Sequence, residues 1–266
     1  MKPTLTALIL LLFITNPAKA TVQEKLKDGG SAVIREVIDG DTVILDRTVQ
    51  GANQVRLVGL QAPKLPLGRK GFRMWPLAPQ SRTALEALTL GRVVNIRYGG
   101  AEMDRHGRLL AHLFLEDGTW VQGQMLSIGM ARVYTFPDNR AVVPDMLRHE
   151  QIARNAGKGI WAHPFYKTHA ATPEALKRFI GTFQVIEGKV IDAARVKNRV
   201  YLNFGNDWRS DFTVTLNSRA RKLFKSADVD PLDYKNKIIR VRGWLKKFNG
   251  PAINATHPEQ IEIIKQ

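Results

Sequence analysis

A run of cationic and aromatic side chains between residues 55 and 75 is the first stretch of this sequence that could do chemistry. It begins VRLVGLQAPK, with Arg56 in an apolar strand and Lys64 just after a turn. It continues LGRKGFRMW, where Arg69 and Lys70 alternate with aromatic residues. Guanidinium groups donate paired hydrogen bonds to phosphate oxygens, and aromatic rings stack on nucleobases. The stretch therefore fits phosphate or nucleic-acid binding; the alternative is a solvated basic turn whose aromatic residues pack on a barrel.

The composition also favours a polyanionic partner. The 266 residues include 40 Lys and Arg against 24 Asp and Glu, which gives a formal net charge of +16. Such a charge favours DNA or RNA first and an anionic membrane surface second, although it can also serve solubility alone. The 44% hydrophobic and 24% charged residues are typical of a globular protein. The chain has no cysteine, which excludes disulfides and thiolate metal sites.

The hydrophobic pattern of the first half predicts the elements that must position these side chains. Runs rich in β-branched residues with a period of two indicate strands, and apolar residues at helical spacing indicate three helices. Three strands, a helix and two strands are the order of an OB-type five-stranded barrel. The predicted strands are 32–38, 42–46, 54–60, 93–98 and 109–115, and the predicted helices are 78–90, 120–128 and 144–156.

The pattern restarts in the second half of the chain. A polar, proline-bearing segment at 166–180 is predicted to be a linker. Beyond it, three strand-like runs, a short helix SRARKLF and two more strand-like runs indicate a second, smaller OB-like β domain. We therefore predict a β-barrel-rich α+β protein with domains at 31–165 and 181–266.

Basic and aromatic residues alternate in RVKNRVYLNFGNDWRSDF and in WLKKFNGP of the second domain. An OB-type face binds single strands through such a mixture. Aromatic residues at alternating positions also pack into a core, and this is the interpretation that we favour from the sequence. The residues concerned are Tyr201, Phe204, Trp208, Phe212, Trp244 and Phe248.

Several separated segments, in order, resemble the thermonuclease (staphylococcal-nuclease-like) family over residues 33–161. They are VIREVIDGDTVIL, VRLVGLQAP, DRHGRLLAHLFLEDG, VQGQMLSIGMARVY and HEQIARNAGKGIW. The resemblance implies an OB-type barrel that hydrolyses phosphodiester bonds in DNA or RNA with the help of Ca²⁺. By resemblance, Arg56 and Arg108 bind the phosphate and Asp41 is the first calcium ligand. His106 lies where the family often has an aromatic residue that contacts the phosphate.

Two positions depart from the family pattern. Gln61 stands where the family has a second carboxylate ligand, and Lys64 stands where it has the glutamate that orients the attacking water. Together they make the site more positive by three charges. Calcium prefers six to eight oxygen ligands, several of them carboxylates, so the sequence predicts weak calcium binding at best. Glu36, Glu102 and Asp104 are nearby acids that could replace the missing ones.

These residues leave two main functions open. The first is phosphodiester hydrolysis, as an endonuclease, with a site that lacks two of the usual acids. The alternative is a catalytically degenerate module that holds nucleic acid or phosphate without cleavage. In that module Arg56, Arg108 and Lys64 would form the pocket, and Gln61, His106, Arg69 and Lys70 would extend it. An envelope-associated structural protein is a third interpretation, and the sequence specifies no oligomeric state.

The N-terminus, MKPTLTALILLLFITNPAKA, predicts a secretory signal. Lys2 precedes an apolar run from Leu5 to Ile14, and the small-residue site Ala18-Lys19-Ala20 follows. We expect cleavage near Ala20 and export to the periplasm or the medium, with no transmembrane span in the mature chain. An uncleaved anchor is the alternative, because the run approaches the length of a short span.

Overall fold

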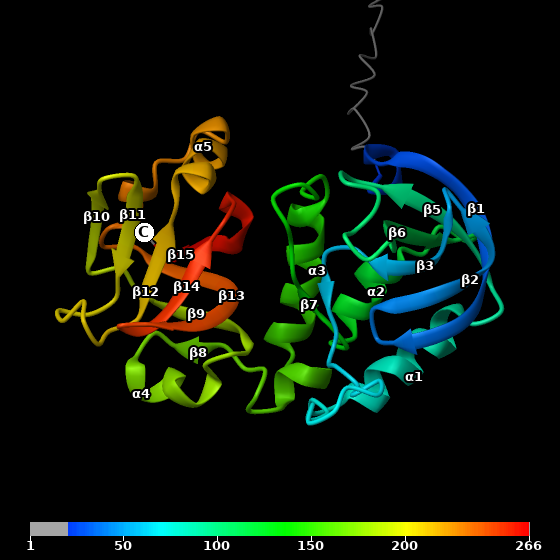
Figure 1. Ribbon diagram of the computed structural model, residues 1–266, viewed down its shortest axis with the longest axis horizontal. Coiled ribbons are helices and arrows are strands. Elements are labelled where there is room, and N and C mark those ends of the chain that lie inside the picture. Colours follow the sequence, from blue (N-terminus) through cyan, green and yellow to red (C-terminus); the bar gives the residue numbers. More distant parts are fainter. Residues whose placement is uncertain (1–20, 266) are drawn as a thin grey trace, which may run out of the picture.

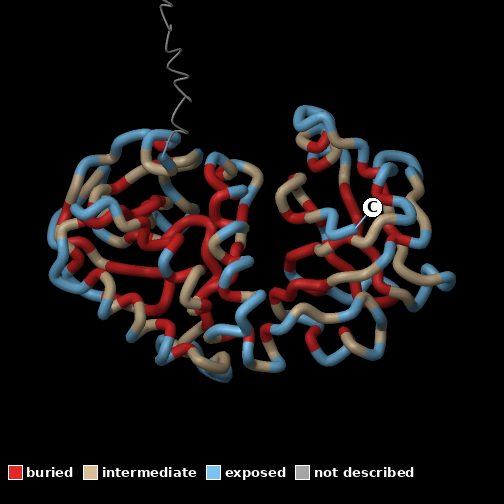
Figure 2. Tube along the Cα trace, turned by 180° about the vertical axis from the view of Figure 1, so that it is seen from behind, coloured by how far each residue is buried: buried red, intermediate tan, exposed pale blue. Residues whose placement is uncertain are grey.

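Two β-rich lobes lie side by side in the computed structural model, which describes residues 21–265 (Figure 1). The predicted secretory signal, residues 1–20, lies outside this described range. Each lobe has its own buried interior, drawn in red in Figure 2. No helix in the described range is long and apolar enough to cross a membrane.

The first lobe is a closed five-stranded barrel, which confirms the predicted OB-type fold. Alternate residues such as Val43, Leu45, Val55 and Leu57 are fully buried inside it. This is the alternation that a strand with one buried face requires. The β3–β6 pair is parallel and the other pairs are antiparallel. The strand order is β1 (Lys27–Asp39), β2 (Thr42–Val49), β3 (Ala52–Leu57), β6 (Leu109–Leu115) and β5 (Val93–Tyr98).

Three helices pack with this barrel, as the sequence predicts. They are α1 (Ala78–Thr89), α2 (Val121–Ser127) and α3 (Val143–Asn155), and a short 3-10 helix, η1 (Gln23–Lys25), precedes the barrel. A separate two-stranded sheet joins β4 (Leu60–Gln61) to β7 (Arg132–Val133). Within it Gln61 is opposite Arg132, so the turn after β3 is tied to the chain leading into α3.

The second lobe repeats the connectivity of the first. Its sheet has the order β10-β11-β12-β14-β13-β9-β8, with β15 paired to β13. The strands β9 and β10 are consecutive in the chain and together correspond to the first strand of the barrel. Counted in this way, both lobes have the same strand order. In each lobe the third strand pairs in parallel with the fifth, here β12 with β14. The strands are β8 (His169–Ala170), β9 (Phe183–Lys189), β10 (Asp192–Val196), β11 (Arg199–Asn203), β12 (Thr213–Leu216), β13 (Ile238–Phe248), β14 (Gly250–Ala255) and β15 (Ile261–Lys265), with α5 (Ser218–Ser226) and the 3-10 helices η4 (Pro231–Tyr234) and η5 (Pro258–Gln260).

Two details of the second lobe differ from the sequence prediction. The first strand is divided, because Val190 bonds to Lys237 beside β13 whereas Ile191 bonds to Asn203 beside β11. The strand β14 was missed, since its Gly250-Pro251 start is typical of a turn.

The segment 166–180, predicted as a linker, has its own structure. It holds β8, α4 (Pro173–Leu176) and η3 (Lys177–Phe179), and it follows the 3-10 helix η2 (Gly159–Ala162). Leu176 and Phe179 belong to the core of the second lobe. The segment therefore packs with that lobe while connecting it to the first.

A buried charged network joins the two lobes. Glu150 of α3 is fully buried and accepts hydrogen bonds from Nη1 of Arg242 on β13, at 2.8 and 3.0 Å. The same carboxylate pairs with Arg154 at 2.9 Å and accepts the backbone N–H of Val133 at 2.8 Å. Arg132 reaches across to donate to the carbonyl of Phe183 at 2.8 Å. These contacts join β7 and α3 of the first lobe to β9 and β13 of the second lobe.

Candidate functional site

The turn between β1 and β2 carries two buried carboxylates that meet the ammonium group of Lys64. Lys64 Nζ lies 2.7 Å from each carboxylate oxygen of Asp41 and 3.3 Å from Oδ2 of Asp39. Asp41 is fully buried, and the Lys64 side chain is 19% exposed. Gly40 lets the turn sit close to α1, because a Cβ there would lie 2.0 Å from Oγ of Ser81. We call Asp39, Asp41 and Lys64 the Lys64 cluster.

One backbone N–H and one hydroxyl group also donate to the Asp41 carboxylate. Its Oδ2 accepts the backbone N–H of Ala62 at 2.9 Å, and its Oδ1 accepts the hydroxyl of Thr42 at 3.2 Å. Asp39 Oδ1 accepts the backbone N–H of Asp41 at 3.1 Å, and this bond shapes the turn. Both oxygens of Asp41 are therefore engaged by donors from this chain.

Arg56 holds the same turn from the other side. Its Nη1 donates to the carbonyls of Asp41 at 3.2 Å and Leu57 at 2.8 Å, and its Nη2 donates to the carbonyl of Leu60. Nη1 also lies 3.2 Å from the Asp41 carboxylate. Among the described residues, Nε donates no hydrogen bond, so this N–H is the donor of Arg56 that an anion could use. The Arg56 side chain is only 12% exposed, so an anion would have to lie against the barrel surface to contact it.

The two carboxyl groups of the cluster have opposite pKa shifts. Burial raises the pKa of Asp41, but the charges of Arg56 and Lys64 outweigh it and hold the pKa well below its ordinary value. Burial, with the neighbouring Asp41 charge, raises the pKa of Asp39 above its ordinary value. Asp41 is therefore the permanent anion of the site, and Asp39 is the group that titrates more easily.

Arg108 immediately precedes β6, the strand that pairs with the β3 strand of Arg56. Arg56 is in register with Leu110 across the parallel β3–β6 pair, and Arg108 precedes Leu110 by two residues. The two arginines therefore come from adjacent segments of the barrel. Arg108 is held by Asp104, with Nε at 2.8 Å and Nη2 at 2.7 Å from Oδ2. Any phosphate at Arg108 must share it with this carboxylate.

The other residues singled out in the sequence lie apart from the cluster or are already engaged. Gln61 is buried and donates to the carbonyl of Ala62 at 3.3 Å. His106 and Lys70 are exposed, and Arg69 lies over the Phe72 ring at 3.8 Å. Trp75, a predicted stacking surface, instead packs on Phe165 and on Trp244 of the second lobe, with ring centres 5.8 and 6.3 Å away.

Sequence proximity suggested three acids that could replace the missing ones, and two of them have other partners. Asp104 binds Arg108, and Glu102 pairs with Lys27 at 2.7 Å. The pairing that sequence reasoning did not anticipate is the close contact of Lys64 with Asp41. The sequence feature that could have indicated it is the opposite charge of the turn with Asp41 and the turn with Lys64.

The residues present do not fit a calcium ion. Calcium needs six to eight oxygen ligands, and the cluster supplies two carboxylates, one of them saturated by Lys64, Thr42 and Ala62. The ammonium group stands where a cation bound to Asp41 would have to be. Over residues 21–265, no group of three or more His, Cys, Asp or Glu side chains is arranged to hold a metal.

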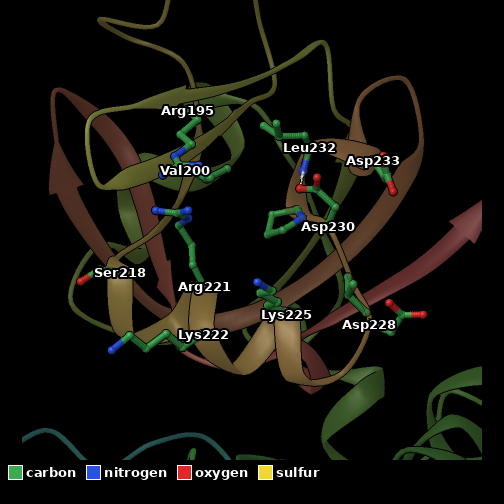
Figure 3. Close-up of a pocket in the computed structure, with 12 residues that line it drawn as sticks. Arg195, Val200, Ser218, Arg221, Lys222, Lys225, Asp228, Asp230, Leu232 and Asp233 are labelled. Carbon is green, nitrogen blue, oxygen red and sulfur yellow. Dashed lines mark hydrogen bonds between the residues drawn. The ribbon is translucent and has the colours of Figure 1, made fainter.

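A cavity of about 590 Å³ lies in the second lobe, away from the Lys64 cluster (Figure 3). Arg221 and Lys225 reach it from α5 below, Arg195 reaches it from β10 above, and Asp230 and Asp233 lie on the segment at the right (Figure 3). The mixed charges of its walls match no single class of ligand.

Comparisons with known proteins place the chain in a family. An OB-type barrel with paired arginines beside an acidic turn defines a nuclease-like fold. The model of the staphylococcal nuclease homologue family matches residues 54–163, a range that includes Arg56, Lys64 and Arg108. This chain belongs to that family, and the resemblance seen in the sequence is confirmed.

Three relatives illustrate the match. An uncharacterized endonuclease of Escherichia coli O157:H7 is 31% identical over 127 residues, which are 47% of this chain and 73% of that protein. Protein ParB of Escherichia coli is 31% identical over 182 residues, 65% of this chain and 88% of ParB. The thermonuclease of Staphylococcus intermedius is 32% identical over 111 residues, 42% of this chain and 64% of that protein.

Proposed function

We propose that this protein binds nucleic acid through its phosphate backbone without calcium and without cutting it. One observation carries the proposal, namely that Lys64 Nζ lies 2.7 Å from both oxygens of Asp41. The ammonium supplies, within the chain, the positive charge that a nuclease of this family would take from a metal. The position that would activate water holds a lysine, which cannot accept a proton while it is charged.

Phosphate recognition in this proposal rests on the two arginines. The Nε–H of Arg56 and the partly exposed guanidinium of Arg108 come from adjacent segments of the barrel. Arg69 and Lys70 add charge in the loop after β4. Contacts of this kind read no base sequence and release counterions, so the affinity should fall steeply as salt is raised.

Metal-independent hydrolysis is the second candidate, and the environment of Asp39 favours it. The raised pKa of this carboxyl, beside the ammonium of Lys64 and the guanidinium of Arg56, suits a group that exchanges a proton near a phosphate. In this candidate Asp39 would be the base and Lys64 would stabilise the developing negative charge.

The test uses a labelled DNA duplex and a labelled single strand, each with chelator and with Ca²⁺. We expect salt-dependent binding to the duplex in both conditions, no cleaved product, and a loss of about 5- to 20-fold in affinity for Arg108→Ala. Arg148→Ala, which removes an exposed arginine of α3, is the matched control. Cleavage in chelator would favour the second candidate, and cleavage only with Ca²⁺ would overturn both.

We also propose that the protein is exported. The support is the N-terminal pattern of a lysine, an apolar run and Ala18-Lys19-Ala20. Fractionation of cells that express the full chain, followed by N-terminal sequencing, should give a mature chain that begins near Thr21. Recovery of the intact N-terminus in the cytoplasm would contradict export.

A further inference from the structure

The sheet of the second lobe leaves one face partly exposed along β10 and β11, whereas the residues of the neighbouring β12 are buried. The opposite face carries Val200, Leu202, Val214 and Leu216, which are buried in the core. Because side chains alternate along a strand, the residues between them point outward. Ala194 is in register with Tyr201 and Tyr201 with Thr215, so these side chains lie in one row on the outer face.

Three aromatic side chains gather around this face. Tyr201 lies on β11, Trp208 lies in the loop between β11 and β12, and Phe248 ends β13. They line a cavity of about 440 Å³ together with Asn203, Thr213 and Asn249. Trp208 is 54% exposed and Phe248 is 47% exposed. Large exposed rings around a hollow are unusual on a folded surface and point to a binding role.

Hydrogen bonds and a close backbone approach hold the two loops that carry the rings. Ser210 Oγ donates to Asp207 at 2.6 Å, and the backbone N–H of Asp207 donates to Asp211 at 2.7 Å. Gly250 brings the β13–β14 turn against this loop, since a Cβ there would lie 2.2 Å from the carbonyl oxygen of Ser210. Trp208 and Phe248 are therefore held near each other by backbone contact.

Cations surround the aromatic face. Arg209 lies over the Trp208 ring at 4.5 Å, and Lys247 precedes Phe248. Lys197 and Arg199 frame the β10–β11 turn, next to Val196 on the lining. The two nearby acids, Asp207 and Asp211, are engaged within their own loop.

We propose that this face is a second nucleic-acid site, which binds unpaired bases of a single strand of DNA or RNA. Bases would stack on Tyr201, Trp208 and Phe248, the amides of Asn203 and Asn249 would bond to their edges, and the cations would contact the backbone. A duplex keeps its bases paired and stacked, so it cannot use the rings. The site goes beyond the proposed function, because no residue of the Lys64 cluster lines it.

The test is binding of the full chain to labelled single strands, with a duplex of the same sequence as the reference. We expect Trp208→Ala and Phe248→Ala each to weaken single-strand binding by about 5- to 150-fold, with duplex binding unchanged. Phe136→Ala removes an aromatic ring of similar exposure, 42%, from the first lobe and should change neither affinity. Single-strand affinity that is unchanged in both variants would overturn the proposal.

Further measurements show whether a variant is still folded, whether the ligand is DNA, RNA or lipid, and whether this site acts independently of the Lys64 cluster. Tryptophan fluorescence of the unaltered protein should be quenched by single strands, and Trp208→Phe should lose most of that quenching while keeping its fold. Oligo-dT and oligo-U arms distinguish DNA from RNA. Duplex binding without single-strand binding would overturn this proposal and leave the proposed function standing. Anionic vesicles whose binding is lost in the same variants would assign the face to lipid instead.

Discussion

Lys64→Met tests the Lys64 cluster through stability. The substitution keeps the length and apolar stem of the side chain and removes the ammonium. Asp41, which is fully buried, then loses the donor that lies 2.7 Å from both of its oxygens. Breaking a buried ion pair by removing one partner costs about 3–5 kcal/mol. Because Arg56 and the Ala62 N–H still contact Asp41, we expect a smaller loss than this, about 2–3 kcal/mol.

The loss should also depend on pH. The folded-state pKa of Asp41 is lowered, so its stabilising contribution is present above its unfolded pKa near 4 and is lost as the pH falls. Lys64 also opposes the upward shift of Asp39, so its removal makes the ionised form of that acid more costly. Protonation relieves both acids, and the difference between the variant and the unaltered protein should therefore shrink as the pH falls below about 5.

Urea unfolding at several pH values measures both effects. Lys70→Met removes an exposed lysine from the same segment and should change the free energy of unfolding by less than about 0.5 kcal/mol. In a double-mutant cycle, Asp41→Asn should cost less in the Lys64→Met background than alone. A Lys64→Met protein as stable as Lys70→Met at neutral pH would refute the buried pairing.

Three further predictions concern the lobe contact, acid stability and phosphate binding. Glu150→Gln leaves the buried Arg242 with a weaker partner and should destabilise the protein by about 2–4 kcal/mol in urea unfolding; a change below 0.5 kcal/mol would contradict the network. Burial lowers the pKa of His112 to about 3 and that of His257 to about 4, so the unfolded chain binds more protons just below pH 6.5. Stability should therefore fall by up to about 1.4 kcal/mol per pH unit for each histidine between pH 6.5 and 5, and His112→Gln should flatten that slope. In a plot of the logarithm of duplex affinity against the logarithm of salt concentration, Arg108→Ala should reduce the slope by about one released counterion. An unchanged slope would show that Arg108 does not contact the DNA.

Most of the first lobe could be predicted from its sequence. Its strands have one buried face, so the period of two is clear, and Gly91 and Gly129 end the first two helices. The second lobe was harder to predict because its first strand changes partners at Val190, which composition does not reveal. The strand β14 begins at Gly250 for a reason that only the fold shows, namely its close approach to Ser210.

The candidate site was predictable in residue type and only partly in geometry. Gln61 and Lys64 could be identified as departures from the family pattern, and Arg56 and Arg108 could be identified as its two arginines. The sequence did not show that Lys64 turns inward onto Asp41. Charge pairing across 23 residues depends on the fold that brings two turns together. The exposure of Trp208, against the core packing that we favoured from the sequence, likewise depends on a loop that no local pattern fixes.

The most direct test of the central claim is the affinity of the full chain for a labelled DNA duplex, measured by fluorescence anisotropy at one salt concentration. The titration is carried out once with chelator and once with Ca²⁺ at matched ionic strength. If Lys64 supplies the charge that a metal would otherwise bring, the two dissociation constants agree within a factor of about two and the duplex stays intact. Binding or cleavage that requires Ca²⁺ would contradict it.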